Sequence, residues 1–582
     1  MRKTLRNRAT MLWCAAIVLL AAMPALLLPA GAGWITDNGN KYIIMRSLAE
    51  GGTTAIANPA AGIDPEGRFF PDGGFHFRRF HGEMRSIYPE YFPALTLPWY
   101  RLFGERGVLV LPALGAMAAA LLFGLWRRRM AAGLLLLAGT PLLFYGGTFW
   151  EMAPSVLFAL TAVMLAVRRR LFLAGLVLGA GLILREEMYF LAVALAAGLL
   201  FADRRQWRGV LRFGVGFLVA ALPLLLWQFH SFGHLLGLHG ALYYSHNRIA
   251  PPTIWEQLSG FFEGCYLYLF QFNAGTPEFR WYYPVLFSPM LLMAAAGAAP
   301  GFGAWRRCKH GAFALASAAW LVLVVMLWRN PAPAMAAGVT VGLFTGTPLM
   351  AGFLLNWRPL LRSAERSSRL LAALAIVYIV LTPPLLTRSD IGIIWGPRHF
   401  LCLMPVLLLL SFEGWRKQRN AEIRQAGAAG SLLRAVQRGR RFLLIPAAAL
   451  GFSLALQLFG LRTLFGVTEE TARLTAKLRS MAPEVVISDL FFLPEQTPQL
   501  FFEKRWLFVK NDEAAAELPA LLARHGIREA VLVLSPRFRN LSDGALRRLL
   551  PSLPLAAPPE RFAAPVSGFL ELFLGKVRLQ SP

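Results

Sequence analysis

Four stretches of this 582-residue sequence place charged side chains within or beside long apolar runs. They are Asp37, Glu151, the triplet Arg185-Glu186-Glu187 and the pair Arg398-His399. A charged side chain at the centre of a membrane costs about 2.5 to 3.5 kcal/mol on the insertion scale. Charges that a chain keeps at such positions are therefore its first candidates for function.

Arginine and carboxylate side chains together can act on a phosphate-bearing substrate. A guanidinium group offers two parallel donors to phosphate, and a carboxylate can take the proton of a hydroxyl group as a new bond forms. If the four stretches line one outward cavity, the set fits a phosphate-bearing lipid. Hard oxygen ligands suit Mg or Mn, so a divalent metal held by Asp37 and Glu151 is a second possibility.

Each stretch also has a purely structural explanation. Asp37 could cap a helix, and Glu151 could be a solvated loop residue. The triplet at 185–187 could be an ion-pair cluster, because pairing offsets the cost of burial. Arg398-His399 could anchor a membrane interface. No stretch is specific alone, and only their combination predicts one site.

The composition is that of a polytopic membrane protein. Hydrophobic residues make up 56% of the chain and charged residues 16%, and the mean hydropathy is +0.50, which is not the composition of a soluble chain. The net charge of +27 comes mostly from basic clusters between apolar runs, which is the pattern of topology signals. The four cysteines suggest neither a disulfide framework nor a CxxC metal site. These features argue against a soluble enzyme, a secreted scaffold and nucleic acid as a partner.

The apolar runs predict a bundle of helices. A span needs roughly 17 to 25 apolar residues to cross about 30 Å of hydrocarbon. The sequence offers a long series of apolar stretches, and we interpret about thirteen of them as spans, some of them shorter than this length. The predicted spans lie near residues 10–30, 107–126, 130–146, 152–167, 171–184, 188–202, 209–229, 283–304, 311–328, 333–356, 369–386, 398–413 and 442–463.

Basic residues set the predicted orientation. Arg2, Lys3, Arg6 and Arg8 precede the first run, so we expect a cytoplasmic N-terminus. That run also resembles a signal peptide. The basic loops and the lack of disulfides suit a bacterial inner membrane. The predicted cytoplasmic clusters are Arg127 to Arg129, Arg168 to Arg170, Arg204 to Arg208, Arg306 to Lys309, Arg358 to Arg366 and Arg416 to Arg441.

Two hairpins of short helices are predicted to hold charges below the outer surface. Between Arg170 and Asp203 lie 32 residues, and one long helix would put the next basic cluster on the wrong side. Arms of about 14 residues rise only about 21 Å, so the tip at 185–187 should lie inside protein or a wet cavity. The same argument places Glu151 at the tip of the hairpin 131–167.

Three segments are predicted to lie outside the membrane. Residues 31–106 should hold a helix from Asp37 to Glu50 and a hairpin at 68–77, and residues 230–282 are rich in aromatics, which suits helices in the interface. Residues 465–582 should form a small periplasmic α/β domain, with strands at 485–488, 506–509 and 530–534 and a helix at 512–525. We therefore expect a transmembrane domain 1–464, which includes loops 31–106 and 230–282, and a soluble domain 465–582.

The arrangement of these features resembles the GT-C glycosyltransferases. The resemblance rests on one span, a large outward loop that opens with Asp37, a second acid, Glu151, between spans three and four, and a soluble C-terminal domain. Within that group the chain is similar to bacterial relatives of the protein O-mannosyltransferases and of the aminoarabinose transferase. The motifs that carry the similarity are Tyr88-Pro89 to Phe103-Gly104, Phe149-Trp150-Glu151, Leu184-Arg185-Glu186-Glu187 and Gly396-Pro397-Arg398-His399.

The resemblance implies transfer of a hexosyl or pentosyl group from a polyprenyl-phosphate carrier to a glycan, lipid or protein acceptor on the outer side of the membrane, with inversion. It implies that Asp37 is the catalytic base and Glu151 a second acidic site residue. Arg398 is the candidate donor-phosphate contact. His399 and Arg185 are further candidates for that contact, and Glu186, Glu187 and Tyr88 are additional cavity candidates. The first motif is Asp37-Asn38 rather than a pair of acids, which favours a metal-free base.

Two rival functions use the same features. A lipid or solute transporter or flippase would also need charged residues in a membrane cavity, but we find no internal repeat of the kind that many transporters carry. A non-catalytic protein of envelope assembly could hold the donor or a partner enzyme, and in that case Asp37 should be dispensable for chemistry.

Overall fold

The structure is a computed structural model. It describes residues 2–31, 33, 35–71, 76–238, 254–270, 272–273, 282–329, 340–385, 395–428, 437, 439, 442–535, 555–566 and 571–578. The chain divides into two compact units. The first comprises Met1–Ala25, Leu111–Trp227 and Arg248–Arg462, and the second comprises Leu26–Val110, Gln228–Asn247 and Thr463–Pro582.

The chain is a multi-pass helical membrane protein. In the part of the chain that the structure describes, seven helices are long and apolar enough to cross a membrane. They are Arg8–Leu27, Tyr91–Trp126, Arg204–Phe232, Arg306–Arg329, Arg366–Pro383, Arg398–Ala426 and Leu444–Ser480. Shorter apolar helices lie at Met152–Val167, Leu171–Ile183, Glu187–Ala202 and Ser288–Gly297.

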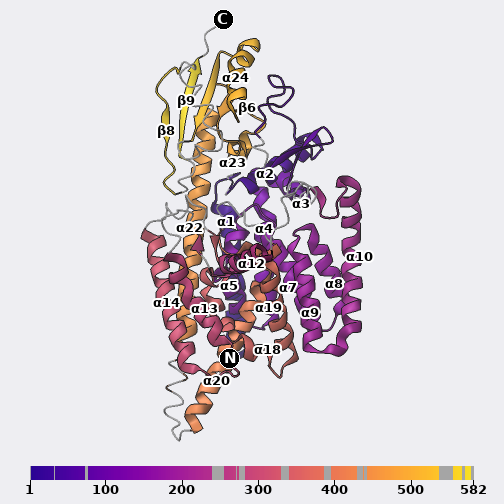
Figure 1. Cartoon of the computed structure of the whole chain (residues 1–582), viewed down its shortest axis with the longest axis vertical. Helices are drawn as coiled ribbons and strands as arrows, with labels where there is room; N and C mark the ends of the chain where they lie inside the picture. Colours follow the sequence, from indigo (N-terminus) through magenta and orange to yellow (C-terminus); the bar gives the residue numbers. More distant parts are fainter. Residues whose placement is uncertain are drawn as a thin grey trace. The chain divides into compact units, whose positions relative to one another are not determined.

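The first unit is built almost wholly of helices (Figure 1). Its main helices are α1 (Arg2–Leu27), α4 (Val110–Trp126), α5 (Met130–Ala138), α6 (Leu142–Gly146), α7 (Met152–Val167), α8 (Leu171–Ala180), α9 (Glu187–Ala202), α10 (Trp207–Phe232), α12 (Ile254–Leu269), α13 (Tyr282–Gly297), α14 (Arg306–Arg329), α19 (Arg366–Leu385) and α20 (Met404–Ala428). Helix α22 (Leu444–Ser480) belongs to the first unit up to Arg462 and to the second unit from Thr463. Short 3-10 segments are η2 (Gly181–Ile183), η3 (Arg204–Gln206) and η6 (Arg398–Leu403). Strands β3 (Phe272–Asn273) and β4 (Thr340–Val341) pair antiparallel.

The predicted hairpin between Arg170 and Asp203 is confirmed as two short helices, α8 and α9, separated by η2. Figure 1 shows α8 beside α10, and glycines allow this approach. A Cβ atom on Gly175 or Gly179 would overlap the carbonyl oxygens of Phe213 and Phe217 in α10. Small residues let membrane helices pack at short distance, so α8 is fixed by backbone contact rather than by long side chains.

The predicted continuous span at 333–356 differs from the structure. From residue 340 onward the chain forms β4 and the short segments α16 (Leu343–Gly346), η5 (Pro348–Met350), α17 (Ala351–Leu354) and α18 (Trp357–Leu361), and residues 333–339 lie outside the described residues. Pro348 cannot donate a hydrogen bond. The N–H of Leu349 donates to Ser453 Oγ at 2.8 Å, and that of Phe353 to Ser411 Oγ at 3.1 Å. Neighbouring helices thus satisfy the broken backbone, as membrane depth requires.

The second unit begins with α2 (Thr36–Gly51). The predicted helix to Glu50 is therefore confirmed. A hairpin follows, but later than predicted: β1 (Phe77–Phe80) pairs antiparallel with β2 (Glu83–Ser86). Its turn is His81-Gly82, both with positive φ, which matches the twist of a hairpin. The predicted turn lies at 71–74, and residues 72–75 lie outside the described residues. Helices α3 (Tyr91–Phe103) and η1 (Gly104–Leu109) complete this part.

The C-terminal part of the second unit holds a five-stranded sheet of order β6-β5-β7-β9-β8. Strand β5 is parallel to β6 and β7, and β9 is antiparallel to β7 and β8. The three predicted strands and the helix are confirmed to within one residue, whereas β8 and β9 were not predicted. The elements are β5 (Val485–Ser488), α23 (Leu493–Gln496), η7 (Pro498–Leu500), β6 (Arg505–Phe508), α24 (Asp512–Arg524), β7 (Glu529–Leu534), β8 (Glu560–Phe562) and β9 (Leu572–Arg578).

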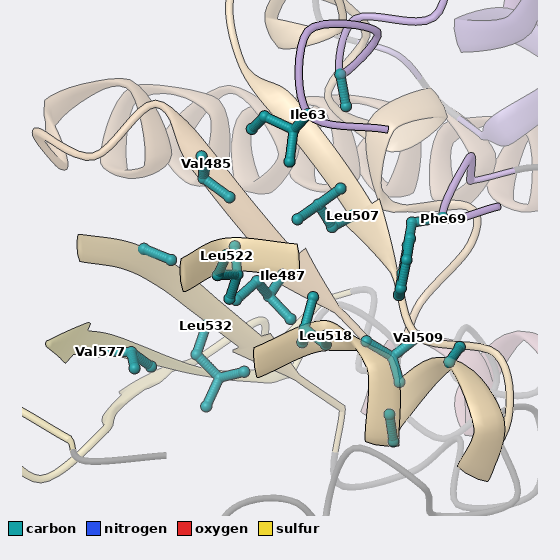
Figure 2. Close-up of a cluster of buried hydrophobic side chains, with 14 of the residues drawn as sticks. Ile63, Phe69, Val485, Ile487, Leu507, Val509, Leu518, Leu522, Leu532 and Val577 are labelled. Atoms are coloured by element: carbon teal, nitrogen blue, oxygen red, sulfur yellow. The ribbon is translucent and has the colours of Figure 1, made fainter. Parts of the chain in front are cut away.

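One face of this sheet is covered by residues from the first outward segment. Figure 2 shows Ile63 and Phe69 packed with Leu507 among the side chains of β5, β6, β7 and α24. The N–H of Phe508 donates to the carbonyl of Phe69 at 2.8 Å. The first outward segment and the C-terminal sheet therefore share one hydrophobic core.

We predict that Phe69→Ala destabilises the second unit. Phe69 is 2% exposed, and truncating a buried phenylalanine costs about 3 to 5 kcal/mol through lost apolar contact and the cavity left behind. Thermal unfolding of the purified protein in detergent would measure this as a lower transition temperature. Phe103→Ala is the matched control, because that ring is 57% exposed. An equal loss in both variants would contradict the shared core.

Candidate active site

Asp37 lies in the first turn of α2. The N-cap of this helix is Ile35, whose N–H donates to Asn38 Oδ1 at 3.3 Å. The Asp37 side chain instead accepts a hydrogen bond from the hydroxyl of Tyr88, Oη to Oδ1 at 2.7 Å. A carboxylate in the first turn is stabilised by the positive end of the helix dipole. Asp37 is thus held as an acceptor in a defined orientation, and the capping position belongs to another residue.

Tyr88 is itself fixed at the end of strand β2. Its N–H donates to Ser86 Oγ at 3.0 Å, and the Ser86 hydroxyl donates to Asn40 Oδ1 in α2. The ammonium of Lys41 lies 5.5 Å from the centre of the Tyr88 ring. Asn40, Lys41 and Ser86 are all buried. The hairpin and α2 are therefore joined by a buried polar network next to Asp37.

His76 and Glu495 form a second pair in the same network. His76 Nδ1 lies 2.6 Å from Glu495 Oε2, and the Glu495 side chain is 0% exposed. The imidazole ring packs between Tyr88, with centroids 5.8 Å apart, and Phe491, at 6.3 Å. We did not single out these two residues from the sequence. The available signal was that Glu495 is the only charged residue between Asp489 and Glu503.

The charges of this network influence one another. Burial disfavours a charged ring, but the charge and hydrogen bond of Glu495, with a further contribution from Asp37, raise the pKa of His76 to about 9. Burial, reinforced by the charge of Asp37, raises the pKa of Glu495, while His76 acts in the opposite direction. At neutral pH the His76 ring is therefore a cation paired with a buried carboxylate.

Tyr88 also borders a hollow in the surface of the second unit. The hollow is small and partly open to solvent. Its walls combine polar side chains with apolar ones, and it is lined by Ile44, Thr54, Arg85, Ser86, Tyr88, Glu90, Phe232 and Leu238. The tyrosine that orients Asp37 is thus reachable from this side.

The first unit brings the two predicted hairpin tips together around Arg185. The guanidinium donates from Nη1 to Glu151 Oε1 at 3.2 Å and from Nε to Glu187 Oε2 at 2.7 Å, with a further contact from Nη2 to Glu187. Glu151 is the N-cap residue of α7, and Glu187 is the first residue of α9. Side-chain exposures are 13% for Arg185, 10% for Glu151 and 7% for Glu187. Pairing offsets the cost of burying these charges.

His399 extends this cluster toward Arg398. His399 Nδ1 lies 2.7 Å from Glu187 Oε1, and Arg398 Nε donates to His399 Nε2 at 3.2 Å. Arginine only donates, so His399 Nε2 is the acceptor of this hydrogen bond. The Arg398 guanidinium also lies over the Trp150 ring, 5.6 Å from its centre. The cluster thus holds two carboxylates, from Glu151 and Glu187, and two guanidinium groups, from Arg185 and Arg398, in equal number.

The predicted site residues thus fall into two groups, one in each unit. Asp37 and Tyr88 belong to the second unit, and Glu151, Arg185, Glu186, Glu187, Arg398 and His399 belong to the first. Glu186 is the N-cap residue of α9 and is half-buried. The group around Asp37 and the group around Arg185 are both held by ion pairs or hydrogen bonds, which stabilise the fold. A preorganised active site requires contacts of the same kind.

The described residues include no group of three or more His, Cys, Asp or Glu side chains arranged to hold a metal ion. Asp37 and Glu151, the predicted ligands, lie in different units. A divalent metal at these residues stays a prediction, and the chemistry proposed below does not depend on one.

A crystal structure of ArnT from Cupriavidus metallidurans in the apo state matches with a TM-score of 0.50 and 13% identity, over 97% of each chain. The chain has the fold of ArnT. A second structure of ArnT from the same organism, bound to undecaprenyl phosphate, gives a TM-score of 0.48 and 14% identity, also over 97% of each chain.

The match to ArnT confirms the predicted resemblance to the GT-C group at the level of the fold. No protein-family model matches the sequence, and no curated protein matches it either. At this identity the likeness to ArnT establishes the architecture, and the roles of individual residues have to be argued from the chain itself.

We predict that the stability of the second unit depends on pH through His76. The pKa of His76 is raised from 6.5 to about 9 on folding, so its contribution is complete below pH 6.5 and is lost as the pH rises through about 9. The His76 side chain is 18% exposed, and we expect a contribution of about 1 to 3 kcal/mol to the free energy of unfolding. The measurement is the unfolding temperature at pH 6 and pH 9.5.

His76→Gln should lose most of this pH dependence. The control is His81→Gln, because His81 is exposed in the turn of the same hairpin and should leave the profile unchanged. Identical profiles for wild type and His76→Gln would show that the pair does not stabilise the unit.

Proposed function

We propose that this protein is a glycosyltransferase that moves a hexosyl or pentosyl group from a polyprenyl-phosphate carrier to a hydroxyl group of an acceptor. The starting point is the fold shared with ArnT, a protein that has been crystallised bound to undecaprenyl phosphate. The observation that carries the proposal is the Asp37 carboxylate, fixed by Tyr88 at the start of α2. The acceptor is a glycan, a lipid or a protein.

The proposed topology follows the basic loops. We propose about thirteen spans in the inner membrane of a bacterium, with the N-terminus in the cytoplasm, residues 1–464 as the transmembrane domain and residues 465–582 as a periplasmic domain. In support, Arg127 to Arg129 connect α4 with α5, Arg168 to Arg170 connect α7 with α8, and Arg204 and Arg205 connect α9 with α10. Alternate connections are therefore basic, as the positive-inside rule requires.

The proposed reaction is a single inverting displacement. The acceptor oxygen attacks the anomeric carbon of the sugar while Asp37 takes the proton of the acceptor hydroxyl. The bond between that carbon and the phosphate oxygen breaks, and polyprenyl phosphate leaves with the bonding electrons. The Tyr88 hydroxyl, 2.7 Å from Asp37 Oδ1, orients the carboxylate so that its other oxygen atom is the proton acceptor.

Arg398 is the proposed contact to the donor phosphate. Its Nε is engaged by His399, which is held by Glu187, so the guanidinium plane is oriented before substrate binds. A guanidinium group oriented in this way stabilises the charge that develops on the leaving phosphate. Arg185 donates to two carboxylates, Glu151 and Glu187, and in this proposal it serves to position them.

We predict that Asp37→Asn abolishes sugar transfer. The amide is isosteric and its oxygen can still accept the Tyr88 hydrogen bond, but it cannot take a proton, so kcat should fall by about 10² to 10⁴. The measurement is sugar release from radiolabelled polyprenyl-phosphate sugars by the purified protein in detergent, with and without EDTA.

Tyr88→Phe is the matched control for Asp37→Asn. It removes the hydroxyl that orients Asp37 and keeps the carboxylate, so it should retain more activity. Full activity in Asp37→Asn would remove Asp37 from the role of base. Donor binding by wild type without any turnover would instead favour a transporter or an assembly protein.

We predict that Arg398→Ala weakens donor binding. A lost charge-assisted hydrogen bond to phosphate corresponds to about 1.5 to 3 kcal/mol, or roughly a tenfold to hundredfold rise in the dissociation constant. Binding of a polyprenyl-phosphate probe would be measured by titration of the purified protein.

Arg101→Ala is the control for Arg398→Ala, because Arg101 is an exposed arginine outside the cluster. It should bind the probe like wild type. Unchanged affinity in Arg398→Ala would count against the phosphate contact.

A further inference from the structure

We infer that the C-terminal segment is part of the catalytic machinery: through the Glu495–His76 pair, helix α23 sets the position and the electrostatic environment of Asp37. This inference rests on the proposed function, because it assigns the pair to the step in which Asp37 takes a proton. His76 and Glu495 are positioning residues in this account.

Helix α23 lies directly against α2. A Cβ atom on Gly39, two residues after Asp37, would overlap the backbone carbonyl of Glu495. All four residues of α23 are buried. Only glycine allows the two backbones to approach in this way, so the first turn of α2 is located by the C-terminal segment.

Further contacts hold the segment in place. Gln496 Nε2 donates to Thr471 Oγ1 at 3.2 Å, and Arg46 Nη1 of α2 donates to the carbonyl of Gln499 at 3.1 Å. Gln499 Nε2 contacts the carbonyl of Gly31, just before α2. The contacts reach both the start and the middle of α2. The segment from α23 to η7 therefore holds α2, the helix that carries Asp37, in place.

His76 is influenced by carboxylates from two elements. Glu495 of α23 accepts its hydrogen bond at 2.6 Å, and Asp37 of α2 is close enough to attract its charge. The other titratable groups of the cluster are Tyr88, whose ring packs on His76, and Lys41, whose ammonium lies over the Tyr88 ring. The imidazolium is thus shared between a buried structural acid and the proposed base.

This sharing has a definite consequence for proton transfer. An imidazolium next to Asp37 without Glu495 would attract the carboxylate strongly and make it a weaker base. A buried Glu495 without His76 would repel the Asp37 carboxylate and favour its protonated form. The imidazolium of His76 and the carboxylate of Glu495 are opposite in charge, so when both are present neither one dominates the electrostatic environment of Asp37.

The test is the pH dependence of kcat in single and double variants, measured by sugar release from a polyprenyl-phosphate sugar. In Glu495→Gln the acidic limb of the plot of kcat against pH should move to lower pH by about 1 unit. In His76→Gln this limb should move to higher pH by a similar amount. In the double variant H76Q/E495Q the limb should return close to the wild-type position. The KM for the donor should change less than twofold in all three.

Opposite shifts that cancel in the double variant would support the inference, because loss of packing alone would lower the rate without moving the limb in opposite directions. The control is Glu503→Gln, which breaks the exposed ion pair with Arg479 in the same unit and should keep the wild-type profile. The double variant buries no unpaired charge, so it keeps the test open if His76→Gln fails to fold.

Active variants that share the wild-type profile would overturn the inference and leave the proposed function standing. A wild type that binds the donor and does not turn it over would overturn the proposed function, and this inference with it.

Discussion

The cost of removing charge from water governs how both polar clusters are built. In the first unit the guanidinium of Arg185 joins two carboxylates from different helices, and in the second unit the buried Glu495 is paired with His76. Breaking one partner of such a pair leaves an uncompensated charge and destabilises the fold by several kcal/mol. The surrounding elements are therefore tied to the clusters: α7 and α9 meet where Glu151 and Glu187 must share Arg185.

The cost of burying charge also explains why helices too short to cross the membrane are tolerated near the clusters. Helix α8 has 10 residues and α9 has 16, which correspond to about 15 and 24 Å, less than the hydrocarbon thickness. Ends that stop short of the surface are tolerable only where protein satisfies their polar groups. The ion pairs around Arg185 meet this requirement, and the serines that bind the broken segment 340–361 do the same elsewhere in the unit.

Much of the architecture could be predicted from the sequence because it depends on local patterns. The length of the apolar runs predicts the spans, and the basic clusters predict the connections between them. The short apolar runs of 485–534, with a helical segment between the last two, predict the sheet. Helix length and the basic loops predicted that the tips carrying Glu151 and Arg185 lie on one side below the outer surface, whereas the hydrogen bond between these two residues was not predicted. The contact between Asp37 and Tyr88 was not, because it depends on the hairpin register, and the hairpin lies later than its glycine-rich turn signal suggests. His76 and Glu495 were missed because they are far apart in the sequence, and a contact between distant residues produces no periodic pattern of residue types. The break at 340–361 was missed because apolar composition does not distinguish a continuous helix from a buried irregular segment.

The core shared between Ile63, Phe69 and the C-terminal sheet sets an order of events during synthesis. At about 5 to 20 residues per second, a ribosome needs on the order of half a minute to a minute and a half to proceed from the first outward segment to strand β7. Throughout that interval Ile63 and Phe69 have no sheet to cover them. The second unit can therefore complete this core only after β7 has been synthesised, and a chain that stops before β7 leaves Ile63 and Phe69 without the side chains that bury them.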